Sequence, residues 1–409
     1  MRIAMLALHT SPLAAPGGYK TGGMNVYVRE LSRELARTGA TVDIFTRRTT
    51  GDEPAIVELE DGARVIHVNS IPLDADSLEV ASANDVLADE IVAWAHRNGV
   101  TYDAIHSHYW VSGAVGICLS RRWALPHVTM FHTLGRIKNQ MRPEEPESEQ
   151  RIAYEEAIIH NADRVVCATE QEAELIEELH GAGGERLAVI PCGVDLKLFH
   201  PGDRAAARLS LGLPSSTPLL LYVGRIEPLK GIDLLISALA MLKPAGGEEQ
   251  PQLLVLGGDE RTGDEVAELR RLAEELGVAD RVRFMGLVGH QTLPLYYNAA
   301  DVCVIPSQYE SFGLVAVESM ACGTPVVASR VGGLISTVND EETGFLVPSR
   351  HPEAIAERIA MLLSNEQRRA AMGAKARRSV ERFGWDSVTE EILNLYRDVL
   401  ASGERAGTL

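Results

Sequence analysis

Two cationic side chains, Arg225 and Lys230, belong to a loop at 224–231 that directly follows an apolar run at 219–223. Cations at the end of a strand and before a helix are well placed to hold the oxygens of a diphosphate as negative charge develops on them. The alternative is that both are ordinary solvated surface cations. Because the chain has a formal net charge of −18, an anionic ligand would need such a local pair of cations, and we interpret the loop as an anion site.

Two carboxylates, Glu310 and Glu318, follow a second apolar run at 302–305. Seven residues separate them, so we expect Glu310 in a loop and Glu318 about two turns into the following helix. Gly313 would free backbone amides at the start of that helix. One carboxylate would then face a sugar and the other a ribose diol, although a chance pair of acids on a helix has the same spacing.

Two further features stand where strands are expected to end. Gly22 and Gly23 close a long loop at 10–23 ahead of a predicted helix, where paired glycines let backbone N–H groups approach a phosphate. An ordinary tight turn has the same sequence. His132 follows the apolar run 127–131, and at a strand end it would face a ligand cleft, whereas a lone histidine is as often structural.

The fingerprint of dinucleotide-binding proteins is absent. No G-x-G-x-x-G motif occurs, and the second predicted strand ends in Phe45-Thr46-Arg47, without the acidic residue that would hold an adenosine ribose. These observations argue against a nicotinamide-dependent oxidoreductase.

The elements around these residues indicate an α/β fold of two Rossmann-like, doubly wound domains. The chain has 409 residues, and continuous apolar runs of strand length alternate with segments of helical period, which is typical of parallel sheets covered on both faces. The pattern restarts after a Pro/Gly-containing linker at 199–203. We therefore predict an N-terminal domain at 1–200 that binds the acceptor and a C-terminal domain at 201–384 that binds a nucleotide-sugar. The helical segment at about 385–409 is a candidate to pack back on the first domain.

Composition limits the partners. The five cysteines form no C-x-x-C pair, which indicates a reduced cytoplasmic protein without structural zinc. No apolar stretch reaches the ~20 residues that span a bilayer, and the negative charge argues against a nucleic-acid partner. A homodimer is left as an alternative for the oligomeric state.

Together, the glycine pair, His132, the two cations and the two carboxylates resemble the signature of family 4 glycosyltransferases, which have the GT-B fold of two Rossmann-like domains facing across a cleft. The resemblance implies a nucleotide-diphosphate sugar as donor, with UDP preferred, retention of anomeric configuration, and no metal or cofactor. It implies catalytic roles for His132, Arg225, Lys230 and Glu310. Donor contacts would come from Gly22, Gly23, Arg225, Lys230, Glu310, Phe312, Gly313, Leu314 and Glu318.

Within that family, three stretches resemble the inositol-phosphate glycosyltransferases of mycothiol synthesis: Gly22–Tyr27, His106–Trp110 and Glu147–Glu149, which lies just before Arg151. The resemblance implies a phosphorylated acceptor, with N-acetylglucosamine as the transferred sugar. Acceptor contacts would come from Asn25, Tyr109, Thr133 and Arg151.

The acceptor match has a gap. Those enzymes use a lysine in a loop that corresponds to about 69–85, and this chain has no lysine there. Arg136 and Lys138 are candidates to replace it, and we assign Lys138 to the acceptor site. The stretch 132–138 also resembles sucrose-phosphate synthases, whose acceptor is fructose 6-phosphate. The stretch Gly22–Asn25 favours the inositol-phosphate enzyme, and transfer of glucose to fructose 6-phosphate or the activity of another family 4 hexosyl- or mannosyltransferase is the alternative.

Three other interpretations are weaker. Asp74-Ala-Asp76 has the form of the D-x-D metal motif of the other major glycosyltransferase fold, but it lies in a polar segment of the first Rossmann-like unit. A cofactor-dependent phosphorylase would need a Schiff-base lysine motif, which we do not find. A catalytically silent nucleotide-binding module would not need His132 or Glu310.

Overall fold

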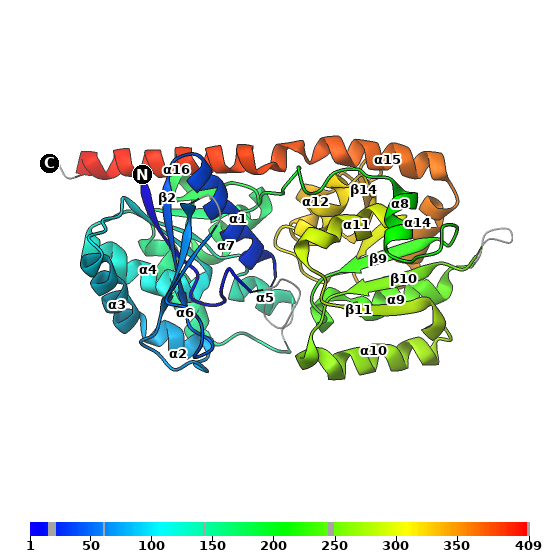
Figure 1. Ribbon diagram of the computed structural model, residues 1–409, viewed down its shortest axis with the longest axis horizontal. Helices are drawn as coiled ribbons and strands as arrows, with labels where there is room; N and C mark the ends of the chain where they lie inside the picture. The colour runs from blue at the N-terminus through cyan, green and yellow to red at the C-terminus, as the bar shows by residue number, and fades with distance from the viewer. Residues whose placement is uncertain (15–21, 60–61, 142–143, 244–248, 407–409) are drawn as a thin grey trace. The chain divides into compact units, whose positions relative to one another are not determined.

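The computed structural model describes residues 1–14, 22–59, 62–141, 144–243 and 249–406, which form two compact units (Figure 1). Among these residues, the first unit covers Met1–Ala14, Met24–Pro191 and the chain from Trp385 onward. The second unit covers Gly22 and Gly23 together with Cys192–Gly384. No helix in the described part of the chain has both the length and the apolar character needed to cross a membrane.

The first unit is built on a sheet of eight strands in the order β3-β4-β2-β1-β5-β6-β7-β8. All neighbours in this sheet pair in parallel except β3, which is antiparallel to β4 at one edge. The strands are β1 (Arg2–Leu6), β2 (Thr41–Arg47), β3 (Ile56–Glu58), β4 (Arg64–Val68), β5 (Ala104–His108), β6 (His127–Met130), β7 (Arg164–Cys167) and β8 (Leu187–Val189).

The helices of this unit pack their apolar sides on the sheet. In α1, for example, Val28, Leu31 and Leu35 recur at helical spacing and are fully buried. The helices are α1 (Gly23–Arg37), α2 (Ser77–Ser82), α3 (Asn84–Arg97), α4 (Tyr109–Trp123), α5 (Gly135–Met141), α6 (Glu149–Asn161), α7 (Glu170–His180) and α16 (Trp385–Ala406). The C-terminal helix α16 contributes buried Val388, Ile392 and Tyr396.

The second unit has a six-stranded sheet in the order β11-β10-β9-β12-β13-β14, with every pair parallel. Its strands are β9 (Leu219–Val223), β10 (Gln252–Leu256), β11 (Val282–Gly286), β12 (Val302–Ile305), β13 (Val326–Ser329) and β14 (Gly344–Val347). Its helices are α8 (Arg204–Ser210), α9 (Ile232–Met241), α10 (Gly263–Glu275), α11 (Leu293–Ala299), α12 (Leu314–Ala321), α13 (Leu334–Thr337), α14 (Pro352–Leu363) and α15 (Glu366–Ser379). The predicted doubly wound α/β class is confirmed in both units.

The stretch 69–85, interpreted above as a loop, contains the helix α2. Asp76 is its N-cap, and its carboxylate accepts hydrogen bonds from the amides of Leu78 and Glu79 at 2.8 and 2.9 Å. Glu79 bonds back to the Asp76 amide at 2.7 Å, which completes a capping box. Asp76 therefore caps a helix, and this structural role accounts for its carboxylate without a metal ion.

Candidate functional site

The loop after β9 holds both predicted cations, each beside a carboxylate. Lys230 ends the short 3₁₀ helix η3 (Pro228–Lys230), and its Nζ lies 2.6 Å from Glu310 Oε2. Arg225 Nη2 lies 2.9 Å from Glu227 Oε1. The structure thus brings Lys230 and Glu310 into direct contact, although they are eighty residues apart in sequence. Glu227 was missed because nothing in its spacing marks it as more than a loop acid.

The two glycines at the start of α1 lie against residues of this loop and of α12. A Cβ on Gly23 would come within 2.9 Å of Leu314 Cδ1, and a Cβ on Gly22 would lie 3.9 Å from Arg225 Nε. A side chain at Gly23 would therefore require the Leu314 side chain to move. Residues 15–21 of the predicted loop at 10–23 lie outside the described residues.

A second glycine pair, which the sequence analysis missed, supports the Glu310 loop. The amide of Gly333 donates to Glu310 O at 2.8 Å. A Cβ on Gly332 would lie 2.0 Å from Glu310 O, and one on Gly333 would lie 2.4 Å from the Phe312 Cα. The backbone that presents Glu310 is therefore packed directly on Gly332 and Gly333, and the paired glycines were the available signal.

Gly313 and Glu318 belong to the start of α12. Gly313 has a φ of +93° and precedes the first helical residue, Leu314, a backbone conformation that favours glycine. Phe312 is buried with its ring edge-on to Phe383. The amides at this helix N-terminus can face an anion or a sugar hydroxyl.

Glu318 lies in the first turn and a half of α12, rather than about two turns along, because the helix begins only at Leu314. It is 7% exposed, and it accepts a hydrogen bond from the Tyr297 hydroxyl at 2.8 Å. The Nε2 of His290 lies 3.2 Å from its other oxygen. These partners, which the sequence did not reveal, orient Glu318, and a carboxylate keeps further lone pairs for a ligand.

His132 follows β6 and is one of three histidines in a row of contacts. Its Nε2 lies 3.1 Å from Nδ1 of His108, whose ring stacks 4.3 Å from that of His106. His106 Nδ1 in turn lies 2.7 Å from the hydroxyl of Tyr396 on α16. The ring of Tyr27 packs edge-on against His132 at 5.4 Å. His132 has a φ of +61°, which is uncommon for a residue with a side chain.

The environment keeps these histidines neutral. Burial lowers the pKa of His132 to about 3, and it lowers the pKa of His106 to about 3 with help from nearby histidines. The pKa of His108 lies well below its ordinary value for the same reasons. At neutral pH His132 can therefore accept or donate a hydrogen bond as a neutral ring, but it is a poor proton acceptor.

Three of the predicted acceptor residues come together around Arg151. This residue is 3% exposed. Its guanidinium carbon lies 5.1 Å from the centroid of the Tyr109 ring, and its Nη2 donates to Thr133 O at 3.1 Å. Tyr109 begins α4 with a φ of +73°, directly after β5. The carboxyl ends of β5 and β6 thus supply Tyr109 and Thr133 to one cluster.

Two glutamates that the sequence analysis did not single out as site residues contact the same arginine. Glu155, fully buried, accepts from Arg151 Nε at 2.7 Å. Glu147 Oε1 lies 2.9 Å from Arg151 Nη1 and also contacts Lys138 Nζ. Burial raises the pKa of Glu155 although Arg151 opposes it. The spacing of four residues between each acid and Arg151 was the signal that could have found them.

Two other candidates have different neighbours. The side-chain Nδ2 of Asn25 donates to Thr10 Oγ1 at 3.0 Å and to Ser11 O at 2.6 Å. The Arg136 guanidinium contacts Glu156 and donates to Leu179 O. Of the two cations that could replace the missing lysine, Lys138 therefore shares a partner with Arg151, whereas Arg136 is paired elsewhere.

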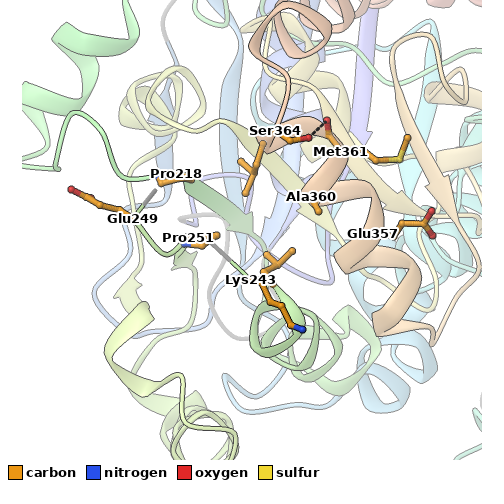
Figure 2. A pocket seen from close by; sticks show the side chains of 10 residues that line it. Pro218, Lys243, Glu249, Pro251, Glu357, Ala360, Met361 and Ser364 are labelled. Carbon is orange, nitrogen blue, oxygen red and sulfur yellow. Dashed lines mark hydrogen bonds between the residues drawn. The ribbon is translucent and has the colours of Figure 1, made fainter. Parts of the chain in front are cut away.

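A cavity of about 350 Å³ lies in the second unit, and none of the residues that line it is a predicted site residue (Figure 2). Pro218 and Pro251 line it, directly before β9 and β10. It is therefore at the amino ends of these strands, opposite the carboxyl ends that carry Arg225 and Lys230. Ligands of open parallel sheets bind at the carboxyl ends, so this cavity is not the candidate site.

Two family models together match most of the chain, and relatives of similar length match nearly all of it. The family model Glycosyltransferase Family 4 matches residues 21–198, and the model Glycosyl transferases group 1 matches residues 203–379. A protein of Xylanimonas cellulosilytica named D-inositol 3-phosphate glycosyltransferase is 44% identical over 97% of this chain and 96% of its own length. A relative from Catenulispora acidiphila, named D-inositol 3-phosphate glycosyltransferase 2, is also 44% identical over 97% of this chain and 94% of its own length. This chain belongs to glycosyltransferase family 4.

Solved structures extend this result to the fold. A sucrose-phosphate synthase from Thermosynechococcus elongatus matches this glycosyltransferase with a TM-score of 0.90 and 38% identity, over 98% of this chain and 99% of that chain. An Anabaena protein in complex with UDP and glucose matches with a TM-score of 0.76 over 97% of this chain and all of its own, and at 23% identity it shows the fold alone. The predicted GT-B fold and glycosyltransferase activity are confirmed.

Proposed function

We propose that this glycosyltransferase transfers a sugar from a UDP-sugar to a small phosphorylated acceptor with retention of configuration. The transferred sugar is N-acetylglucosamine and the acceptor is an inositol phosphate. The observation that carries the acceptor class is the cluster of Tyr109, Thr133 and buried Arg151, since a guanidinium is well suited to bind a phosphate. Two relatives that are 44% identical to the chain are named for an inositol phosphate acceptor.

The donor is held by the second unit and the glycine pair. Arg225 and Lys230 bind the diphosphate and stabilise the charge that develops on it as the sugar leaves. The Gly23 amide contributes at the N-terminus of α1, where the helix dipole favours an anion. These groups supply the positive charge that a metal ion would otherwise provide, so the proposed reaction needs neither metal nor cofactor.

The transferred sugar is held by Glu310 and by the amides of Phe312–Leu314. Lys230 lies 2.6 Å from Glu310, so the group that binds the leaving phosphate also fixes the carboxylate that binds the sugar. Glu318 accepts hydrogen bonds from the ribose diol, and His132 contacts the sugar near its 6-hydroxyl. The diphosphate and the sugar are thus bound by two loops in contact with each other, which aligns the bond between sugar and diphosphate that breaks.

Retention follows from attack of the acceptor on the same face as the departing diphosphate, with the leaving phosphate taking the acceptor's proton. His132, with a pKa of about 3, is a poor candidate for a general base at neutral pH. The lowered pKa supports a mechanism in which the substrate itself accepts the proton.

A second candidate function is transfer of glucose to fructose 6-phosphate. The structural match to a sucrose-phosphate synthase at 38% identity favours it, and Lys138 lies in the stretch 132–138 that resembles those enzymes. Both functions use a phosphorylated acceptor, so the Arg151 cluster is compatible with either.

A transfer screen distinguishes the candidates. The donors are UDP-N-acetylglucosamine, UDP-glucose, GDP-mannose and ADP-glucose, the acceptors are inositol 1-phosphate, inositol 3-phosphate and fructose 6-phosphate, and released nucleotide is measured. We expect transfer from UDP-N-acetylglucosamine to an inositol phosphate. NMR of the product should show the same α-anomeric linkage as in the donor. Transfer only to fructose 6-phosphate would support the second candidate, and inversion would overturn the proposed mechanism.

A further inference from the structure

One carboxylate oxygen bridges the two cations of the acceptor cluster. Glu147 Oε1 lies 2.9 Å from Arg151 Nη1 and contacts Lys138 Nζ. An oxygen that bridges a guanidinium and an ammonium group has the contacts that a phosphate oxygen would make there. The same residues are those assigned above to the acceptor phosphate.

The two glutamates on Arg151 differ in how firmly they are held. Glu155 is fully buried, and it also accepts from the amide of Gly135 at 2.8 and 3.1 Å. The Glu147 side chain is 25% exposed. Glu155 is therefore a permanent partner that orients Arg151, whereas Glu147 lies on the solvent side and can be replaced by another anion.

The backbone at Glu147 places its side chain over the start of α6. Its amide donates to Asn139 Oδ1 at 2.6 Å. The next residue, Ser148, caps α6 by accepting from the Arg151 amide at 3.2 Å. These contacts hold the main chain at Glu147 and Ser148, and the described contacts of the Glu147 carboxylate are made by its Oε1. Burial acts to raise the pKa of Glu147, yet Arg151 and Lys138 outweigh it and hold the pKa below its ordinary value, so the group is charged at neutral pH.

Among the described residues of the cluster, positive and negative charges are equal in number while Glu147 is in place. Arg151 and Lys138 supply two positive charges, and Glu147 and Glu155 supply two negative ones. A phosphate that entered beside Glu147 would add like charge at close range, which is unfavourable. A phosphate that replaced Glu147 would meet both cations.

We propose that Glu147 occupies the acceptor-phosphate position as an internal anion, and that the phosphate of the acceptor displaces it to bind Arg151 and Lys138. This inference rests on the proposed function, because it takes the acceptor to be phosphorylated. Glu147 then makes acceptor binding selective for phosphorylated molecules, because a phosphate can displace its carboxylate and an uncharged group cannot. Lys138 takes the part of the lysine that is missing from 69–85.

The test removes the charge of Glu147 while keeping its shape. Glu147→Gln and wild type are titrated with inorganic phosphate in saturating UDP, which fills the donor site, and the rise in Tm is measured. We expect phosphate to bind about three- to tenfold more tightly to Glu147→Gln, because it no longer competes with a bound carboxylate. The matched control is Glu156→Gln. This variant removes a carboxylate of α6 that pairs with Arg136 instead of Arg151, and it should respond as wild type does.

Kinetics give a second readout. Glu147→Gln should lower the KM for the phosphorylated acceptor by a similar factor and leave the KM for the UDP-sugar unchanged. The gain should disappear in Glu147→Gln/Lys138→Met, because Lys138 then cannot bind the phosphate. If Glu147 only braces α5 against α6, Glu147→Gln would bind phosphate no better than wild type and its acceptor KM would stay the same or rise, which would overturn the inference.

The two readouts separate this inference from the proposed function. If Glu147→Gln binds phosphate more tightly but the enzyme transfers to no acceptor in the screen, the inferred role of Glu147 is supported and the acceptor assignment is contradicted. Transfer to an inositol phosphate with unchanged phosphate binding would keep the function and contradict the role of Glu147.

Discussion

His108 Nδ1 and His132 Nε2 lie 3.1 Å apart, and the other nitrogen of His108 lies 2.9 Å from Met5 Sδ. A thioether sulfur can only accept a hydrogen bond, so we assign the proton of neutral His108 to Nε2. Its Nδ1 must then accept from His132 Nε2–H, which leaves His132 Nδ1 as an acceptor. The pair therefore selects the tautomer with which His132 would accept a hydrogen bond from a sugar hydroxyl.

The first prediction concerns that hydrogen bond. His132→Ala should lower kcat by about 10- to 100-fold, because a positioned hydrogen bond to the reacting sugar is lost. The KM for the UDP-sugar should change much less. In the wild-type enzyme, ionisation of His132 should not appear in the pH dependence of kcat near neutrality, since its pKa is about 3. A rate loss that follows titration of this residue between about pH 6 and 7 would contradict the assignment.

The second prediction concerns acid stability of the first unit. Burial lowers the pKa of His106, His127 and His132 to about 3 each, below the unfolded value of about 6.5. The unfolded chain thus binds protons first as the pH falls. Stability from these residues is complete above about pH 6.5 and is lost progressively toward pH 3. Calorimetric Tm values across this range should show the loss.

A variant pair checks that the loss comes from buried histidines. His127→Gln removes a buried ring that lies 2.7 Å from Ser107 Oγ, and its Tm should depend less steeply on pH. His96→Gln removes an exposed histidine of α3 and should keep the wild-type slope. Equal slopes for all three proteins would contradict the prediction.

The third prediction concerns Lys230. Lys230→Ala should lower kcat by about 100-fold or more, because charge on the leaving diphosphate is no longer stabilised and Glu310 loses its partner. Lys230→Arg should recover part of the rate. The matched control is Lys197→Ala, an exposed lysine of the same unit. Steady-state kinetics at saturating acceptor make the comparison, and unchanged kcat in Lys230→Ala would exclude the assigned role.

The fourth prediction concerns Arg151. Removing it alone would leave Glu155 buried without its cation, at a cost of about 3–5 kcal/mol. The double variant Arg151→Met/Glu155→Gln avoids this penalty. We expect the double variant to fold, to keep the wild-type KM for the donor, and to raise the acceptor KM about tenfold or more. A raised KM for the donor with an unchanged KM for the acceptor would show that Arg151 belongs to the donor site and contradict its assignment to the acceptor site.

Several residues of the donor and acceptor sites could be predicted because their positions follow from local features of the sequence. Arg225 and Lys230 follow a continuous apolar run that is typical of a buried strand, and Gly313 stands directly before a helix, where its φ is positive. The helix boundary was less certain, so Glu318 was placed about half a turn too far along α12. Helix ends depend on capping contacts that a periodic pattern does not reveal.

The partners of these residues were beyond the sequence. Nothing local marks Tyr396 as the hydrogen-bond partner of His106, 290 residues away, or Gly333 as the support of Glu310. Even Glu155, one helical turn from Arg151, was missed, because i,i+4 acids are common on solvated helix faces and only burial shows that this pair is internal.

The sequence by itself determined the α/β class, the family and the residue types at the strand ends, because hydrophobic period and glycine placement are local properties of the chain. Only the tertiary structure decided which charges meet. Lys138 is joined to Arg151 through Glu147, whereas Arg136, two residues earlier, is bound to Glu156. Coulombic pairing depends on distance in space, and side chains two residues apart in a helix point in different directions, so that choice is made when the fold closes.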